Sequence, residues 1–338
     1  MESALILRMI SDILRPANKA SDQRNDHFDG KRFHNVFEKR DHRFKDIFKV
    51  LTTSNRKKWP KIKANSHRPR LHLVLNQRQA AVTFVNHATL LIQLPGLNIL
   101  TDPVWSKRVS PFRFAGPKRA RPPGIAFDEL PKIDLVLISH NHYDHLDLAT
   151  VKKLAERDHP RILISKGDLD ILERHQIDNA REMDWWEKED FASLEITFAP
   201  NQHFSSRGLL DRNRSLWGSF MIRHQGKNLY FGGDSAYSAH YRQIRERLGP
   251  TDLAFLPIGA YEPFWFMGLV HMKPEESVQA HLDLQSKQSV GIHFGTFQLT
   301  EEGIAEPVAR LNQRLNEVGL GADRFTTLGE GETQVFDL

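Results

Sequence analysis

The feature that most constrains this chain is a cluster of ionisable side chains directly after a short apolar run. Residues 135–138 are apolar, and the cluster that follows consists of His140, His142, Asp144 and His145. An apolar run of this length with turn chemistry after it predicts a buried strand. In an extended chain His140 and His142 project to the same side, whereas the two later residues belong to the turn. Because imidazole and carboxylate suit zinc, iron or manganese, the spacing indicates two metal positions.

Three later residues can complete this cluster, because each lies at or just after the end of a predicted strand. They are His203, Asp234 and His293. Asp234 follows two glycines, which allow close approach of the backbone, and its carboxylate can bridge two cations. The predicted ligands are His140, His142 and His203 on one metal, Asp144, His145 and His293 on the other, and Asp234 between them. A seven-ligand set leaves room for a bridging water or hydroxide, so the pattern predicts a hydrolase site.

Composition narrows the chemistry further. There is no cysteine, so disulfides and thiolate metal sites are excluded and histidine and carboxylates remain as the strong ligands. The 338 residues can form one large domain or two. No run of 18 apolar residues occurs, so we expect no membrane-spanning helix. Residues 1–14 carry three charges, which disfavours a secretory signal and leaves an amphipathic helix as the expectation.

The charge is concentrated near the N-terminus. Residues 31–70 hold fourteen Lys or Arg and three Asp or Glu, a net charge of +11, whereas the whole chain carries +5. Within this segment, residues 44–51 fit one face of a basic amphipathic helix, which either lies on an anionic membrane or docks on the core. The whole segment is alternatively a solvated basic surface. We expect residues 1–75 to form a basic, partly helical extension that packs on a catalytic domain at 76–338.

The periodicity of apolar residues predicts an early group of hairpin strands and a later alternation of strands and helices. Strands are expected at 81–85, 89–93, 97–101, 135–138, 162–165, 194–198, 215–223, 228–231, 253–257 and 289–293. Helices are expected at 148–158, 168–175, 236–248, 274–284 and 302–315, with Asp147 as a cap. Residues 258–272 are irregular and aromatic. This order favours two sheets with helices on the outside.

Motifs around the ligands carry a resemblance to a known family. They are Ser139-His-Asn-His-Tyr-Asp-His-Leu-Asp147, Gly116-Pro-Lys-Arg119, Met183-Asp-Trp-Trp-Glu187, Leu216-Trp-Gly-Ser219, Pro257-Ile-Gly-Ala-Tyr-Glu-Pro263 and Ile292-His-Phe-Gly-Thr296. The sequence resembles the metallo-β-lactamase superfamily and, within it, the N-acylphosphatidylethanolamine-hydrolysing phospholipase D family, over roughly residues 80–335. The resemblance implies an α/β fold of the αββα four-layer sandwich type. It also implies two zinc ions and hydrolysis of a phospholipid to phosphatidic acid and an N-acylethanolamine.

The resemblance also implies roles for individual residues. The seven residues above become metal ligands, with Asp144 and Asp234 catalytic as well; manganese or iron would fit the same ligands. His271 corresponds to a catalytic position near the phosphate, with a structural role as the alternative. The implied substrate-binding residues in the aromatic segment are Tyr261, Trp265, Phe266 and His271. We expect His87 and Asp102, at turns that face the site, to support it rather than to bind metal.

Competing functions are disfavoured but not all excluded. No Gly-x-Ser-x-Gly elbow of a serine hydrolase occurs. His271-Met-Lys273 begins the His-x-Lys-(x4)-Asp pattern of the other phospholipase D type, but position 278 is Val. The alternatives are the same metal site acting on a lactone, a cyclic phosphodiester or a nucleic acid, or a non-catalytic lipid- or nucleic-acid-binding protein. Our prediction is a cytoplasmic, peripherally membrane-associated phospholipase with no nucleic-acid partner. Its oligomeric state is left open, a homodimer included.

Overall fold

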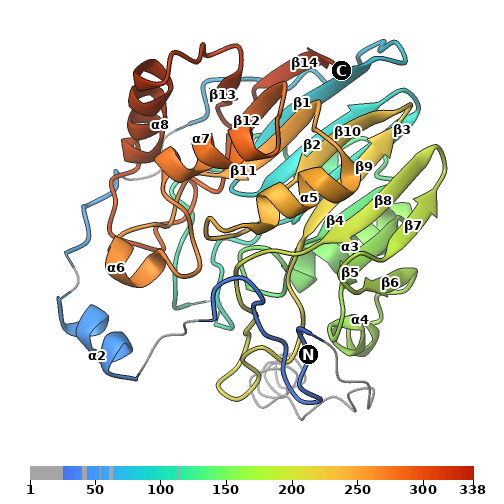
Figure 1. The fold of residues 1–338 in the computed structure, drawn as a ribbon. Helices are drawn as coiled ribbons and strands as arrows, with labels where there is room; N and C mark the ends of the chain where they lie inside the picture. The colour runs from blue at the N-terminus through green and yellow to red at the C-terminus, as the bar shows by residue number, and fades with distance from the viewer. Residues whose placement is uncertain (1–25, 40–43, 54, 61–63, 113) are drawn as a thin grey trace.

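The computed structural model describes residues 26–39, 44–53, 55–60, 64–112 and 114–338 (Figure 1). The helix expected at residues 1–14 lies outside the described residues. Within them, two seven-stranded sheets form the body of the molecule. Among the same residues, none of the helices combines the length and the apolar character needed to cross a membrane.

The two sheets have the same internal plan. The first contains, in spatial order, β14 (Thr333–Asp337), β1 (Gln79–Asn86), β2 (Thr89–Leu94), β3 (Leu97–Thr101), β4 (Leu135–Ile138), β5 (Arg161–Ser165) and β6 (Ala180–Met183). The second contains β13 (Phe325–Thr327), β12 (Gln288–Ile292), β11 (Leu253–Pro257), β10 (Lys227–Phe231), β9 (Ser219–His224), β8 (Leu194–Ala199) and β7 (Lys188–Phe191). In each sheet the first strands along the chain pair antiparallel and the next ones pair parallel.

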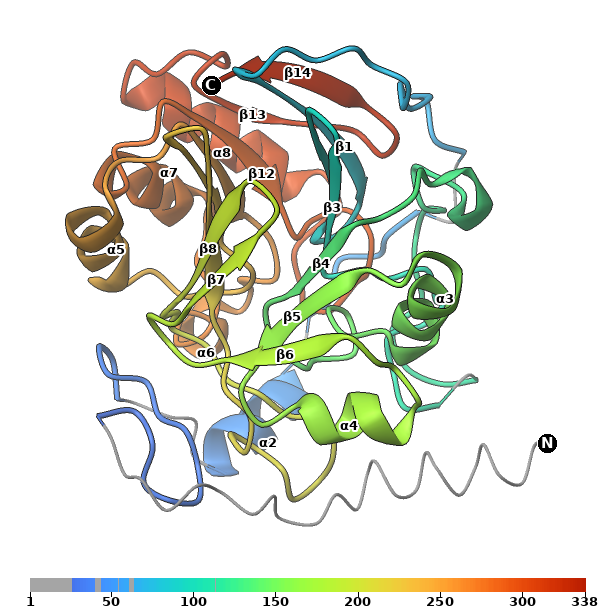
Figure 2. The ribbon, with the colours of Figure 1, turned by 90° about the vertical axis from the view of Figure 1, so that its right-hand side faces the viewer.

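Helices cover the outer face of each sheet (Figure 2). The first sheet carries α3 (Leu148–Asp158) and α4 (Leu169–Arg174), and the second carries α5 (His240–Leu248), α7 (Pro274–Asp283) and α8 (Glu306–Glu317). One apolar core lies between the sheets, where Phe84 and Phe231 are fully buried. Two further cores join the sheets to their helices. This arrangement confirms the predicted αββα sandwich.

Some predicted element bounds, and the predicted capping role of Asp147, differ from the structure. The strand expected from 215 begins only at Ser219, because residues 216 and 218 donate their backbone N–H groups to loops of the first sheet, at Lys166 and Ser139. The α5 helix begins at His240 instead of 236. Asp147 lies at the N-cap of α3 but makes no capping bond, since its carboxylate accepts hydrogen bonds from the backbone of residues 105 and 106.

The N-terminal part of the chain runs over the body of the molecule. Residues 26–39, which we call the strap, form a turn at Gly30, whose φ is +94°, flanked by a bridge between Phe28 and Phe33. Both phenylalanines are buried in the core between the sheets. The short helices α2 (Phe44–Thr53) and α6 (Phe264–Met267) lie on the same side of the molecule (Figure 1).

Candidate metal centre

The predicted ligands come together at one end of the gap between the two sheets. They lie on the loops that follow β4 in the first sheet and β8, β10 and β12 in the second. Close contact between these loops needs small residues. At Gly233, which has a φ of +55°, an added Cβ would lie 2.7 Å from the Cβ of Ser139. The glycine before Asp234 therefore lets the carboxylate of Asp234 approach the loop of His140.

One group contains His140, His142 and His203. The Nε2 atom of His140 lies 2.8 Å from Nδ1 of His142, and Nε2 of His203 lies 3.3 Å from the same Nδ1. One nitrogen from each ring lies within 4.8 Å of the other two. The structure thus brings together the three residues that the sequence assigned to the first metal; their role as ligands stays a prediction.

A second group contains Asp144, His145 and His293, with His87 beside them. The Nε2 atoms of His145 and His293 each lie 3.6 Å from Oδ2 of Asp144. Nε2 of His87 lies 2.9 Å from the same oxygen and forms a hydrogen bond with it. His87 therefore contacts a predicted ligand, as expected of a supporting residue, and is also close enough to belong to the cluster.

The carboxylate of Asp234 lies between the two groups. Its Oδ2 is 3.0 Å from Nε2 of His145 and 3.0 Å from Nε2 of His293. The same oxygen is 4.0 Å from His140 Nε2 and 3.9 Å from His203 Nε2. Asp234 is thus within reach of both groups, which is the position that a bridging carboxylate requires.

Buried polar atoms with few partners fit a divalent metal. Asp234 Oδ1 is buried and makes no hydrogen bond within the described part of the chain, and the buried Nε2 atoms of His145 and His293 face carboxylate oxygens of the cluster. A buried polar atom without a partner costs about 1–3 kcal/mol, and a cation held by several such atoms offsets this cost. Nitrogen and carboxylate oxygen in this number are a suitable donor set for zinc, manganese or iron.

Neighbouring groups orient the imidazoles toward the centre. Asp102, fully buried, accepts hydrogen bonds from His145 Nδ1 at 2.6 Å, from the Ser139 hydroxyl at 2.6 Å and from the Ser139 backbone N–H at 2.7 Å. The backbone carbonyl of Val270 accepts from His203 Nδ1 at 2.7 Å. In both rings the proton is thereby held on Nδ1, so the lone pair of Nε2 points into the cluster.

The imidazoles of the cluster differ in charge, because His140 and His203 have lowered pKa values whereas His145 and His293 have raised ones. Burial lowers the pKa of His140 and of His203 well below the ordinary value, so both rings are neutral, as metal ligands must be. Burial opposes charge on Asp234, but His145 and His293 outweigh it and hold the pKa of Asp234 well below its usual range. The same interaction raises the pKa of His293 to about 9 against the effect of burial.

A cavity of about 500 Å³ leads to the cluster. Its floor includes His142, Asp144 and Asp234. Apolar side chains line the wall, among them Val50, Phe204, Phe266, Met267 and Leu299. Arg56, Glu262 and Glu301 line it as well. The site is therefore a mainly apolar cavity, to which three of the predicted metal ligands contribute.

The residues predicted to bind substrate are placed differently from one another. His271 borders the cavity, and its buried Nδ1 lies 4.0 Å from Asp234 Oδ2. Phe266 also lines the cavity. Tyr261 is fully buried, with the guanidinium of Arg310 4.7 Å from its ring centre, and is not among the residues that line the cavity, so its role in substrate binding stays a prediction. Trp265 is not a lining residue either, and it is 48% exposed.

Two contributions from the N-terminal part were not predicted. Val50 and Arg56 line the cavity, although the sequence assigned their region to a basic extension. The side chain of Asn35, in the strap, hydrogen-bonds the backbone carbonyl and N–H of His203. One signal could have located the strap: Asp29-Gly30 lies between two phenylalanines, which is typical of a tight turn between extended segments. Nothing in the sequence indicates which loop it contacts.

Comparison with known proteins agrees with this geometry. Residues 97–294 match a family described as the beta-lactamase superfamily domain. The chain is 37% identical over 264 residues to the N-acyl-phosphatidylethanolamine-hydrolyzing phospholipase D 1 of Caenorhabditis elegans, covering 74% of each chain. It is 37% identical to the mitochondrial protein of the same description from Saccharomyces cerevisiae, covering 72% of this chain and 53% of that one. The fold matches that of Igni18, a metallo hydrolase from Ignicoccus hospitalis, with a TM-score of 0.59, 20% identity and coverage of 77% and 99%.

The fold and its clustered histidines and aspartates define a metal-dependent hydrolase of the metallo-β-lactamase type, which confirms the predicted class. Within that class the family can be named, because 37% of the aligned residues are identical to those of the Caenorhabditis elegans protein over 74% of its length. The chain belongs to the family of N-acylphosphatidylethanolamine-hydrolysing phospholipases D.

Proposed function

We propose that this protein is a dinuclear metal phosphodiesterase. Its substrate is N-acylphosphatidylethanolamine or a related phospholipid, and its products are phosphatidic acid and an N-acylethanolamine. The observation that carries the proposal is the position of Asp234 between two groups of three ligands at the floor of a mainly apolar cavity. Similarity to two relatives described as hydrolysing this lipid supports the choice of substrate.

We infer that the metals are two zinc ions. His140, His142 and His203 would hold one, Asp144, His145 and His293 the other, and Asp234 both. Two such cations, when bound, lower the pKa of a water molecule and stabilise charge that develops on phosphoryl oxygens. The protein's part is to orient the ligands, which the hydrogen bonds of Asp102 and of the Val270 carbonyl achieve for His145 and His203.

His271 is the proposed contact for the phosphate. It borders the cavity, its Nδ1 has no hydrogen-bond partner among the described residues, and burial lowers its pKa to about 4. A neutral imidazole beside the metal ligands can donate one hydrogen bond to a phosphoryl oxygen without adding a charge. Among the predicted substrate-binding residues, Phe266 lines the cavity, where it would contact an acyl chain together with Met267 and Leu299.

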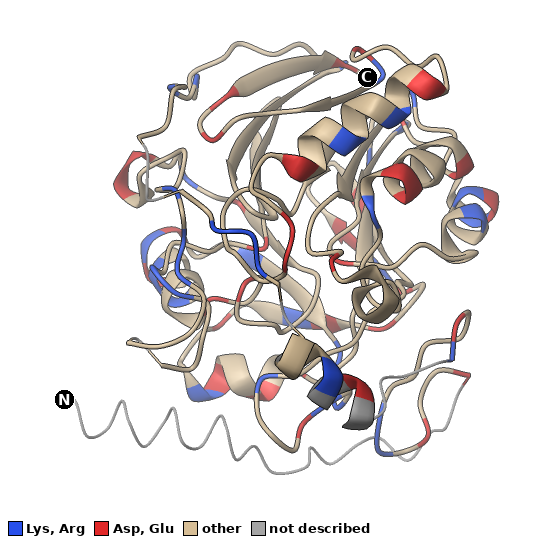
Figure 3. Cartoon of the chain, turned by 90° about the vertical axis from the view of Figure 1, so that its left-hand side faces the viewer, with Lys and Arg blue, Asp and Glu red and all other residues tan. Residues whose placement is uncertain are grey.

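The substrate would be taken from a membrane surface. The proposal rests on the net charge of +11 over residues 31–70, and Figure 3 faces the side of the molecule that carries α2, where basic positions recur along the segments in front. We retain residues 1–75 as an extension on a catalytic domain at 76–338, with the strap and α2 contributing to its site. Sedimentation with anionic vesicles should fall as salt rises; binding equal to that of neutral vesicles, and indifferent to salt, would rule this out.

A product assay tests the proposed activity. Zinc-loaded protein is incubated with vesicles containing N-acylphosphatidylethanolamine and, separately, with an N-acyl homoserine lactone, and the metal-free protein serves as the control. We expect phosphatidic acid and N-acylethanolamine in equal amounts and no ring opening of the lactone. Hydrolysis of the lactone with no lipid product would instead favour another substrate on the same metal centre.

A further inference from the structure

The strap, residues 26–39, is fixed to the body of the molecule on both sides of its turn. Phe28 and Phe33 are 8% and 4% exposed and their rings pack with centres 4.6 Å apart in the core between the sheets. His27 stacks on Trp185 at 4.5 Å and hydrogen-bonds Asp184 at 2.7 Å. The backbone N–H of Phe33 donates to the carbonyl of Asn213 at 2.7 Å. The strap is therefore held firmly enough to support other groups.

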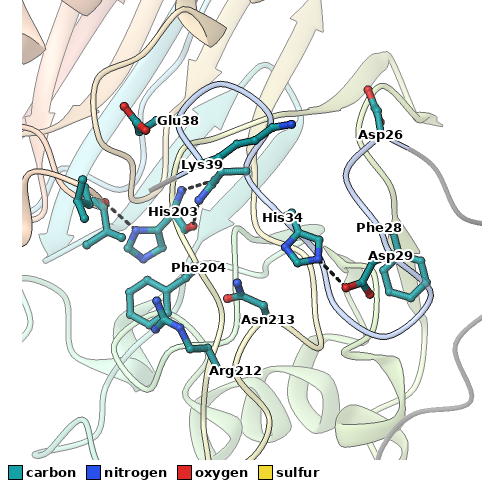
Figure 4. A pocket seen from close by; sticks show the side chains of 13 residues that line it. Asp26, Phe28, Asp29, His34, Glu38, Lys39, His203, Phe204, Arg212 and Asn213 are labelled. Carbon is teal, nitrogen blue, oxygen red and sulfur yellow. Dashed lines mark hydrogen bonds and ion pairs between the residues drawn. The ribbon is translucent and has the colours of Figure 1, made fainter. Parts of the chain in front are cut away.

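Beyond Phe33 the strap runs along the loop that carries His203. Figure 4 shows that side chains of both segments line a cavity of about 310 Å³. This loop follows β8 and lies outside the sheet, so no neighbouring strand fixes its backbone. Its hydrogen bonds must come from other parts of the chain.

The side chain of Asn35 supplies these bonds at His203 itself. Its Nδ2 donates to the carbonyl of His203 at 2.8 Å, and its Oδ1 accepts from the backbone N–H of His203 at 3.2 Å. One amide thus satisfies both backbone groups of one residue, as a neighbouring strand would. The indole N–H of Trp217, fully buried, donates to the same Oδ1 at 3.2 Å and fixes the orientation of the amide.

The adjacent residue adds a second connection. The side-chain amide of Gln202 donates to the carbonyl of Glu38 at 2.8 Å, and its Oε1 accepts from the backbone N–H of Glu38 at 3.2 Å. The strap and the loop are thus joined by two reciprocal pairs of hydrogen bonds at neighbouring positions. Together these two pairs leave little freedom for the backbone at residue 203 to rotate or shift.

We propose that Asn35 is a positioning residue for the metal centre. By holding both backbone groups of His203 it sets the direction of that imidazole, while the carbonyl of Val270 sets the rotation of the ring. The strap is then a part of the active site, although its residues bind neither metal nor substrate. The proposal rests on the role of His203 as a ligand in the proposed function.

The chemistry of asparagine is specific to this role. Alanine at position 35 would leave both backbone groups of His203 without these partners. Aspartate has the same shape and keeps the two accepted bonds, but it replaces the donor by an oxygen that faces the carbonyl of His203. Because Asn35→Asp preserves packing, it tests the hydrogen bonds even if Asn35→Ala proves too unstable to purify.

The test uses metal affinity and a spectrum, neither of which depends on the lipid. The full-length protein, Asn35→Ala, Asn35→Asp, His203→Ala and the control His34→Gln are loaded with cobalt(II), and affinity is measured by competition with a chelator. His34 lies next to Asn35, is exposed and pairs with Asp29, so its replacement changes the strap without touching His203. We expect Asn35→Ala to weaken cobalt binding about tenfold or more and to alter the visible absorption spectrum. Asn35→Asp should change affinity and spectrum in the same direction, and His34→Gln should match the wild type within about twofold.

The outcomes separate this inference from the proposed function. If His203→Ala weakens binding but both Asn35 variants keep the wild-type affinity and spectrum, the positioning role is wrong and the metal centre stands. If His203→Ala also binds cobalt as the wild type does, His203 is not a ligand and both proposals are wrong. Thermal unfolding of the metal-free proteins shows whether a change in affinity has its origin in the metal site or in a general loss of stability.

Discussion

Replacing Asp102 by asparagine should weaken metal binding far more than it weakens the fold. Oδ1 of this carboxylate accepts one backbone N–H, and Oδ2 accepts from both the Ser139 hydroxyl and His145 Nδ1. An amide nitrogen in place of Oδ2 faces two donors. The hydroxyl of Ser139 can turn and accept, but His145 can do so only by moving its proton from Nδ1 to Nε2. A protonated Nε2 has no lone pair for a cation.

The magnitude follows from this change of tautomer. Loss of a carboxylate that orients a ligating histidine costs about 10–100-fold in metal affinity, or about 1.4–2.8 kcal/mol. The effect on the metal-free fold should be smaller, about 1 kcal/mol. Burial raises the pKa of Asp102, which indicates that the ionised carboxylate carries a desolvation cost that asparagine avoids.

The assay is zinc affinity by chelator competition, with urea unfolding in EDTA as the measure of the fold. Asp134→Asn is a matched control, because Asp134 also accepts a backbone N–H, from Asn98, but lies at the other end of β4. We expect Asp134→Asn to bind zinc as the wild type does. A zinc affinity for Asp102→Asn within about twofold of the wild type would refute the reasoning.

Three further predictions concern acid stability, the cavity and metal removal. Burial opposes charge on Asp184, but hydrogen bonds from His27 and Lys166 lower its pKa from 3.8 to about 2. Its contribution to the free energy of unfolding is thus complete above about pH 4 and is lost as the pH falls toward 2. In denaturant titrations at each pH, Asp184→Asn should therefore lose about 2 kcal/mol less unfolding free energy than the wild type over this range. Equal losses in the two proteins would contradict this prediction. Phe266→Ala should raise KM for vesicular lipid several-fold with metal content unchanged, whereas replacing Leu282, which is exposed on α7, by alanine should not. A KM for Phe266→Ala equal to that of the wild type would show that Phe266 does not contact the substrate. Zinc at 100 times its Kd should stabilise the metal-free protein by about 2.7 kcal/mol for each ion bound, a gain that His203→Ala should reduce; no shift in Tm on adding zinc would argue against the site.

Much of the sandwich was predictable from periodicity. The helix at 148–158 and the strand at 253–257 agree to the residue with α3 and β11. Each is long or apolar enough for its own pattern to identify it. The strands that were missed, namely β6, β7, β13 and β14, contain many polar residues and lie at or near the sheet edges. Pairing with a neighbour stabilises such strands, and a single sequence does not reveal pairing.

The clustering of the predicted metal ligands was predictable for a different reason. These residues follow the ends of strands. Strands that run in the same direction end at the same edge of a sheet, so residues far apart in the sequence come close together there. The contribution of Asn35 lacks any such rule, because it depends on where the strap crosses the body of the molecule. The burial of Tyr261 was not predictable either, because an aromatic residue in an irregular segment can face the core as well as a cavity.

The central claim is that water attacks phosphorus at a dinuclear metal centre. The most direct measurement is turnover of N-acylphosphatidylethanolamine by the zinc-loaded protein in ¹⁸O-labelled water, with mass spectrometry of both products. Attack at phosphorus breaks the bond from phosphorus to the ethanolamine oxygen, so one labelled oxygen should appear in phosphatidic acid and none in N-acylethanolamine. Label in the N-acylethanolamine, or turnover that continues after the metal is removed, would contradict the account.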